Sequence, residues 1–307
     1  MMETNWKTSW SDEELVALRE VLHLLGREAR PLFSANQWNS LRRFVHQGIR
    51  NGLFGRNNYG VSRLLHSLQT AYVVLHDIGL KMPSFVTVML YHTTEGEDGV
   101  KRETIVNTFG EDTAHLLDCM RQVKNLYAQH DDNALEDENF RKLFLSMAKD
   151  IRVIICLIAG RYVLMRLLNH SKEVEYRKRI TQECRLLYTP MSHRLGLYAI
   201  KRELEDMAVK YDDRETYDRI AHGLQQTKTA REAYIKAFIE PLEKRLKDST
   251  QLRFHIKGRT KSISSIQHKL IAQSTTLENI YDLFAIRIII DEPDPAKEKA
   301  ACWQAYS

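Results

Sequence analysis

The sequence predicts a mostly α-helical protein that ends in a short α/β segment. Apolar residues recur at helical spacing over most of residues 1–250, which is typical of amphipathic helices. From Arg253 to Lys257 polar and apolar residues alternate, as they do in a half-buried strand. The run LFAIRIII at 283–290 is almost continuously apolar, so we expect a second strand that is buried on both faces.

The first half of the chain carries the start and stop signals of successive helices. The stretch WSDEELVALREVLHLL begins with Ser-Asp-Glu-Glu, a typical helix start. After a glycine-marked loop, RLLHSLQTAYVVLHDIGL predicts a helix that ends at Gly79. Pro83 opens the next helix, and we expect the chain to continue helical through FGEDTAHLLDCMRQV.

An acidic, polar connector is expected at residues 130–138, before a long apolar segment. That segment, LFLSMAKDIRVIICLIAGRYVLMRLLNH, predicts a helix in the buried centre of the first domain. The chain is then expected to be helical on either side of Pro190, and residues 212–247 should form further helices that lead into the strand at Arg253.

Composition allows two modest domains and excludes disorder. The 307 residues are 43% hydrophobic and 28% charged. The excess of 45 Lys and Arg over 40 Asp and Glu is small, so it fits anionic small molecules or a ribosome-facing surface as well as nucleic acid. The four cysteines form no CxxC pair, which favours core thiols in a reducing compartment. No apolar run is long enough to span a bilayer and no signal peptide is visible, so we expect a cytoplasmic protein with no membrane partner.

The stretch RFHIKGRTKSISSIQHKL at 253–270 has the layout of a polyphosphate site. A strand reaches Gly258, where we expect the chain to turn over, and cations, hydroxyls and an apolar helical pattern follow. A helix N-terminus and converging cations together favour a bound anion. Asp282 precedes the second strand and is a natural Mg²⁺ ligand beside phosphates. Alternatively, the basic turn is only a solvated surface and Asp282 only a capping residue.

The segments GRTKSISSIQHKL and IYDLFAIRI resemble the start of the synthetase domain of the RelA/SpoT homologue family, which transfers pyrophosphate from ATP to the 3′-hydroxyl of GDP or GTP. The resemblance implies an α/β, nucleotidyltransferase-like domain. It also implies that Arg259 contacts the ATP base, that Lys261, Ser265 and Lys269 hold phosphates, and that Asp282 is the catalytic residue that binds Mg²⁺. At Thr260, Ser262 and Ser264 the chain departs from the Pro, His and Tyr of the family.

Histidines in the helical half raise the question of a metal site. His66, His92 and Asp77 could be ligands, although a lone helical histidine is more often a core or surface residue. The order of segments is similar to the hydrolase domain of the same family, an HD-type all-helical fold that holds Mn²⁺ with two histidines and two aspartates. His66 and His92 match the ligand histidines.

The carboxylates of that hydrolase pattern are missing. In MLYHTTEGEDG, Thr93 replaces the first ligand aspartate, and Gly96 and Glu97 occupy the catalytic Glu-Asp positions. In AGRYVLMRL, Gly160 replaces the second ligand aspartate. A hard cation needs oxygen ligands and charge neutralisation, so two neutral imidazoles would bind Mn²⁺ poorly. We therefore expect a degenerate, inactive hydrolase domain without Mn²⁺.

The resemblance also implies a domain order. YTPMSHRLGLYAIKRELEDMA is similar to the family segment that joins the two domains. We expect the helical hydrolase-like domain at 1–190, connecting helices at 191–250 and the first part of the synthetase domain at 251–307. The family's later synthetase residues and its C-terminal domains that sense the ribosome do not occur in this sequence, so we expect a truncated fragment that is itself inactive.

These expectations favour one role in the stringent response. The parent protein is expected to be a GTP pyrophosphokinase that uses ATP, GDP or GTP and Mg²⁺ to make (p)ppGpp. Two alternatives stay open. The first is an active, metal-dependent (p)ppGpp 3′-pyrophosphohydrolase or bifunctional enzyme with a rearranged site at His66 and His92. The second is a module that only senses nucleotides.

Overall fold

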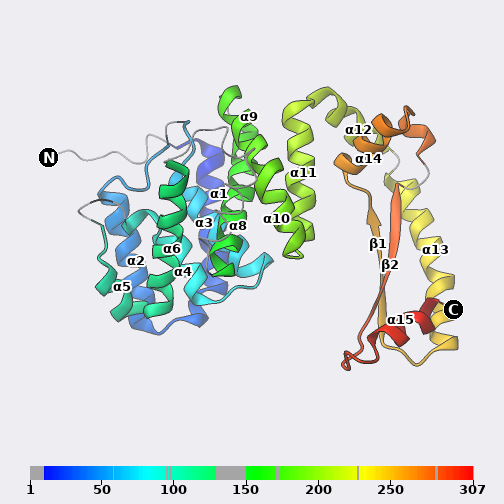
Figure 1. The fold of residues 1–307 in the computed structure, drawn as a ribbon, viewed down its shortest axis with the longest axis horizontal. Helices are drawn as coiled ribbons and strands as arrows, with labels where there is room; N and C mark the ends of the chain where they lie inside the picture. The colour runs from blue at the N-terminus through cyan, green and yellow to red at the C-terminus, as the bar shows by residue number, and fades with distance from the viewer. Residues whose placement is uncertain are drawn as a thin grey trace. The chain divides into compact units, whose positions relative to one another are not determined.

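The computed structural model describes residues 10–57, 59–94, 96, 99–128, 150–170, 173–226, 228–280 and 283–306. It is mostly helical with one small sheet, as the sequence predicts (Figure 1). By contacts between backbone segments the chain divides into two compact units, Met1–Ala208 and Val209–Ser307.

The elements of the first unit are, in chain order, α1 (Asp12–Glu28), η2 (Arg30–Leu32), α2 (Ala35–Arg50), α3 (Arg63–Tyr72), η3 (Val73–Asp77), α4 (Met82–Leu90), η4 (His92–Thr94), α5 (Arg102–Phe109), α6 (Glu111–Ala128), α8 (Ile151–Leu167), η6 (Leu168–His170), α9 (Val174–Glu183), η7 (Cys184–Tyr188) and α10 (Thr189–Arg194). Helix α11 (Tyr198–Asp212) crosses into the second unit. There follow α12 (Arg214–Gln226), α13 (Lys228–Ser249), β1 (Phe254–Thr260), α14 (Ile263–Ala272), η8 (Leu277–Asn279), β2 (Phe284–Ile290) and α15 (Glu298–Tyr306).

Helix starts and stops follow local sequence signals in unit 1. Ser11 caps α1 by accepting the backbone N–H of Glu14 at 3.2 Å, and the Glu14 carboxylate accepts the N–H of Ser11 at 3.0 Å. Pro83 lies in the first turn of α4, and Gly79 has a φ of +81°, which ends the preceding helical segment. The expectation of continuous helix through residues 91–110 is wrong. Helix α4 ends at Leu90, and Gly110, with a φ of +92°, separates α5 from α6.

The core of unit 1 lies between α3, α4, α6 and α8, which contact one another (Figure 1). Most side chains of α8 are buried, so the predicted central helix is confirmed over Ile151–Leu167. The predicted connector at 130–138 and the first residues of the apolar segment lie outside the described residues.

In unit 2, β1 and β2 form an antiparallel two-stranded ladder with α13 beside it (Figure 1). Phe254, Ile256 and Gly258 pair with Ile290, Ile288 and Ile286 and share one face. The expectation that β2 is buried on both faces is wrong. Its side chains are half-buried or exposed, because a two-stranded ladder covers only the face that packs on α13.

Gly258 does not turn the chain over, as the sequence analysis expected. It lies inside β1, paired with Ile286. A Cβ atom at this position would lie 2.5 Å from Cγ2 of Ile235 in α13, closer than real contacts allow. The glycine therefore allows the helix to approach the strand.

Helix α14 packs on unit 2 through its apolar side. Ile266 is buried with Ile220 of α12 and with Ile280, and Ile263 and Leu270 pack against this cluster. The predicted helical spacing of these apolar residues is thus confirmed, and the opposite side of α14 remains available to polar residues.

Three of the four cysteines, Cys119, Cys156 and Cys184, are buried as predicted, and none of the four is in a disulfide. Cys302 is exposed, so its expected place in a core is wrong: it lies on the outer side of α15. None of the helices in the described residues combines the length and the apolar character that a membrane span needs.

Candidate functional site

The histidine and glycine singled out in unit 1 meet between α3 and α8. His66 is half-buried, and its Nε2 lies 2.8 Å from the carbonyl oxygen of Gly160. A carbonyl can only accept, so Nε2 carries the proton and donates it. That nitrogen is therefore not available as a metal ligand while this hydrogen bond exists.

Burial also decides the charge of His66. Loss of solvent lowers the pKa of His66 from its usual 6.5 to about 4, against the raising effect of the Gly160 carbonyl; nearby His92 and Arg161 lower it further. The imidazole is thus neutral at neutral pH, with its proton on Nε2.

An expected pH dependence of stability follows. Because the unfolded state binds a proton below about pH 6.5 and the folded state only below about pH 4, this contribution to stability is complete above pH 6.5 and is lost as the pH falls toward 4. The free energy of unfolding should fall by up to about 1.4 kcal/mol per pH unit in that window from His66 alone. Urea unfolding of the wild type and of His66→Gln, which keeps an N–H donor without titrating, checks this between pH 7 and pH 5.

The control for that experiment is His46→Gln, since His46 is exposed on α2. It should follow the wild type at every pH. Parallel curves for wild type and His66→Gln would contradict a buried, neutral His66.

Position 160 faces the His66 ring. A Cβ atom on Gly160 would lie 3.8 Å from Cε1 and 4.0 Å from Nε2 of His66, at ordinary van der Waals distance. A side chain at 160 would therefore reach His66 without a clash, and glycine supplies no ligand there.

Thr93 lies in η4 and is 1% exposed. Its hydroxyl donates to the carbonyl oxygen of Leu90 at 2.8 Å, so the oxygen serves the local backbone. Its methyl group packs toward Gly48 of α2, where an added Cβ would meet it at 2.8 Å. Thr93 thus fills space between α2 and η4, where a carboxylate ligand was sought.

The other predicted residues of this site are only partly placed. His92 is half-buried in η4, edge-on to the rings of Tyr91 and Phe54 at centroid distances of 5.2 and 6.1 Å. Gly96 is exposed, and Glu97 lies outside the described residues. Asp77 is exposed at the end of η3, and its pKa is raised by partial burial.

Within the residues that the structure describes, no three His, Cys, Asp or Glu side chains gather closely enough to hold a metal ion. The described donors at these positions are the imidazole of His66, whose Nε2 donates to Gly160, and the imidazole of His92. The hydroxyl of Thr93 donates to Leu90, and Gly160 has no side chain. These described donors do not fit Mn²⁺, which prefers charged oxygen ligands, and Glu95, Glu97 and Asp98 lie outside the described residues.

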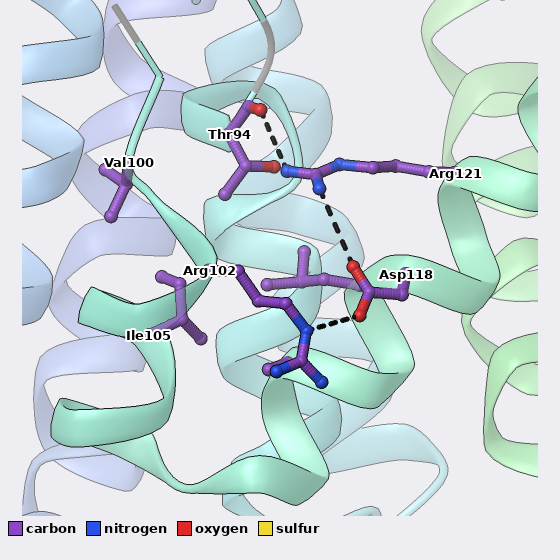
Figure 2. A pocket seen from close by; sticks show the side chains of 8 residues that line it. Thr94, Val100, Arg102, Ile105, Asp118 and Arg121 are labelled. Atoms are coloured by element: carbon purple, nitrogen blue, oxygen red, sulfur yellow. Dashed lines mark hydrogen bonds and ion pairs between the residues drawn. The ribbon is translucent and has the colours of Figure 1, made fainter.

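A hollow beside η4 contains a residue that the sequence analysis missed (Figure 2). Arg121 of α6 donates from Nη2 to the carbonyl oxygen of Thr94 at 2.8 Å, and its Nη1 lies 3.7 Å from Oδ1 of Asp118. Asp118 also accepts from Nε of Arg102 at 2.8 Å, and Arg102 pairs with Glu111. Arg121 holds the end of η4 through its bond to Thr94, but an Arg three residues after an Asp looks in sequence like any solvated helix face.

In unit 2 the proposed phosphate residues follow the end of β1. The backbone N–H of Lys261 donates to the carbonyl oxygen of Leu283 at 2.9 Å, which extends the ladder up to the start of α14. Ser262 caps α14, and its Oγ lies 2.7 Å from Oγ of Ser265. Ser265 and Lys269 are four residues apart in α14, so they lie on one face of the helix. Lys261 directly precedes the cap, and all three residues are half-buried. We refer to Lys261, Ser265 and Lys269 as the phosphate row.

The exposed face of the ladder adds Arg287, a second residue that the sequence analysis missed. Lys257 and Arg287 are direct cross-strand partners, and both side chains are exposed. Like charges opposite each other destabilise a sheet, so this arrangement favours an anionic ligand on that face. The sequence signal was the single charge inside the apolar run LFAIRIII.

Asp282 lies outside the described residues, and so does the side chain of Arg259. The roles of Lys261, Ser265 and Lys269 stay predictions, as do those of Asp282 and Arg259.

Comparison with known proteins matches both parts of the chain. Residues 49–198 match the family described as HD domain, and residues 258–306 match the region found in RelA / SpoT proteins. A probable guanosine-3′,5′-bis(diphosphate) 3′-pyrophosphohydrolase of Synechocystis is 32% identical over 82% of this chain and 32% of its own length. A GTP pyrophosphokinase of Myxococcus xanthus is 33% identical over 85% of this chain and 33% of its own.

A bifunctional (p)ppGpp synthase/hydrolase of Escherichia coli is 28% identical over 72% of this chain and 31% of its own length. The chain thus spans about a third of the length of these relatives. Their names include both activities, so similarity alone does not choose between synthesis and hydrolysis.

Proposed function

The chain belongs to the RelA/SpoT homologue family, and from this premise we propose that the complete gene product makes (p)ppGpp and that its HD domain has lost hydrolysis. The reaction is transfer of pyrophosphate from ATP to the 3′-hydroxyl of GDP or GTP. The relatives' names support (p)ppGpp metabolism, and the site residues support the choice of activity.

The observation that carries the loss of hydrolysis is the hydrogen bond from His66 Nε2 to the Gly160 carbonyl at 2.8 Å. Because Nε2 carries the proton of this hydrogen bond, it has no lone pair to give to a metal. The bond lies at position 160, where the sequence has glycine in place of a carboxylate. At the other ligand position, Thr93 stands in place of a carboxylate, and its hydroxyl donates to the carbonyl oxygen of Leu90. Hydrolysis by metal-activated water has no support in this donor set.

The synthetase role rests on the row Lys261, Ser265 and Lys269 at the start of α14 and on the cationic face of the ladder. Lys261 and Lys269 would neutralise phosphate oxygens of ATP, and the hydroxyl of Ser265 would donate to one of them. Asp282 would hold Mg²⁺, which when bound supplies further charge neutralisation at the phosphates. ATP, GDP or GTP, contact with the ribosome through other regions and a cytoplasmic location belong to the same proposal.

The proposal is tested by two assays on purified protein. The 307-residue chain, incubated with labelled ppGpp and Mn²⁺, should release no pyrophosphate above the protein-free control. The complete gene product should convert ATP and GDP into ppGpp.

Each assay has a contrary outcome. Release of pyrophosphate by the chain, abolished in His66→Ala, would favour the active-hydrolase alternative. Nucleotide binding without either reaction in the complete gene product would favour a sensing module instead.

A further inference from the structure

The outer face of α2 carries only cations and amides. The exposed side chains over Ala35–Arg50 include Asn39, Arg42, Arg43, His46 and Arg50, and the helix contains no Asp or Glu. Arg42, His46 and Arg50 are spaced four residues apart, so they line up along one stripe. We name this set, Asn39, Arg42, Arg43, His46, Gln47 and Arg50, the α2 stripe.

In the part of the chain that the structure describes, no carboxylate pairs with the cations of the α2 stripe. Within the described residues none of its cations is in an ion pair, whereas neighbouring helices pair theirs, as Arg152 does with Asp112 at 2.6 Å and Arg102 with Asp118 at 2.8 Å. A solvated face with mixed charge needs no partner. A single-sign stripe without counter-charge attracts an anionic partner.

The side of α2 opposite the α2 stripe is packed against the rest of unit 1. Leu41, Phe44 and Gly48 on the opposite side of α2 are buried, and α2 contacts α4, η4 and α5 (Figure 1). The ring of Phe44 meets that of Phe109 edge-on at 6.3 Å, and Gln37 donates to the carbonyl oxygen of Thr108 at 3.2 Å. The backbone that carries the cations is therefore packed against the rest of unit 1.

The chemistry of the stripe selects the kind of anion. No large hydrophobic side chain is exposed on α2, so the face has neither the apolar side of a membrane-surface helix nor the apolar anchors of a protein interface. From Arg42 to Arg50 the stripe spans about 12 Å of helix axis. That length covers roughly three phosphates of a nucleic-acid strand, at about 3.4 Å of duplex axis per phosphate.

We propose that the α2 stripe binds the phosphate backbone of double-stranded RNA, across its minor groove. The minor groove of A-form RNA is wide and shallow, and the amides of Asn39 and Gln47 suit its 2′-hydroxyls. The proposal is independent of the function proposed for the nucleotide site.

The test measures fluorescence anisotropy of a fluorescein-labelled RNA duplex of roughly 20 base pairs with the whole 307-residue chain. Binding is expected at about 50 mM KCl and should weaken roughly fortyfold at 200 mM, since three phosphate contacts give a logarithmic slope near −2.7. The variant Arg42→Gln/Arg43→Gln/Arg50→Gln should lose roughly tenfold or more in affinity and show a flatter salt dependence.

The matched control removes three exposed arginines elsewhere in unit 1, as Arg19→Gln/Arg194→Gln/Arg202→Gln. It should bind like the wild type, and both variants should keep the wild-type thermal melting curve. Equal losses in the two variants would reduce the effect to net charge and overturn the proposal.

Three further outcomes would also overturn it. They are no binding at 50 mM KCl, equal affinity for a DNA duplex of the same sequence, and displacement of the RNA by polyglutamate at equal charge concentration. The last would assign the stripe to an acidic protein.

Discussion

Replacing Asp282 with Asn in the complete gene product is expected to lower the rate of pyrophosphate transfer by roughly a thousandfold or more. The substitution keeps the size of the side chain and removes the charge that would hold Mg²⁺ against the ATP phosphates. Leu283, the next residue, accepts the backbone N–H of Lys261 at 2.9 Å, which joins this part of the chain to the start of the phosphate row. The measurement is the initial rate of ppGpp formation from ATP and GDP at saturating substrate.

Two companion variants separate catalysis from folding. Lys269→Ala should mainly raise the KM for ATP, because it removes a phosphate contact and leaves the metal ligand. If Asp282 only caps β2, Asn would serve as well, and Asp282→Ala would lower the melting temperature while Asp282→Asn kept near-wild-type synthesis. That pattern would remove Asp282 from the proposed mechanism.

Restoring both carboxylates, as Thr93→Asp/Gly160→Asp, is expected to create Mn²⁺ binding that the wild type lacks, with affinity higher by roughly a hundredfold or more. A side chain at 160 would face His66 at contact distance, so the new carboxylate would lie beside that imidazole. Without metal the two buried charges should destabilise the protein by several kcal/mol. Mn²⁺ at about a hundred times its Kd should then return about 2.7 kcal/mol of stability.

Calorimetric titration and thermal melting with and without Mn²⁺ measure the two effects. The matched control is Thr93→Asn/Gly160→Asn, which has similar volume without charge and should neither bind Mn²⁺ nor be stabilised by it. Stoichiometric Mn²⁺ binding by the wild type at micromolar affinity, lost in His66→Ala, would show that the site is not degenerate.

The local signals of the sequence were sufficient for most of the described helices. The capping box of Ser11 and Glu14, the break at Gly79 and the cap at Ser262 act within a few residues, so they could be predicted from the chain. The placement of Ser265 and Lys269 on one face of α14 follows from helical spacing alone. The absence of carboxylates at 93 and 160 is likewise a property of the sequence.

Contacts between distant segments could not be predicted in this way. Gly258 looked like a turn, because the sequence does not show that Ile235 of α13 lies against it. The sequence predicts that Arg287 lies in a buried strand. The strand register instead places it opposite Lys257 on an exposed face. The hydrogen bond from Arg121 of α6 to the carbonyl oxygen of Thr94 in η4 joins residues 27 positions apart in the sequence, so the local pattern could not predict it.

The sequence by itself determined which residues are present at the candidate sites, whereas the tertiary structure decided what those residues do. Without carboxylates, His66 could have been an exposed or idle imidazole. Packing of α3 on α8 brings it to the carbonyl oxygen of Gly160, 94 residues away in sequence, and burial makes it a neutral hydrogen-bond donor. Both effects depend on the removal of water between two helices, which no local pattern encodes.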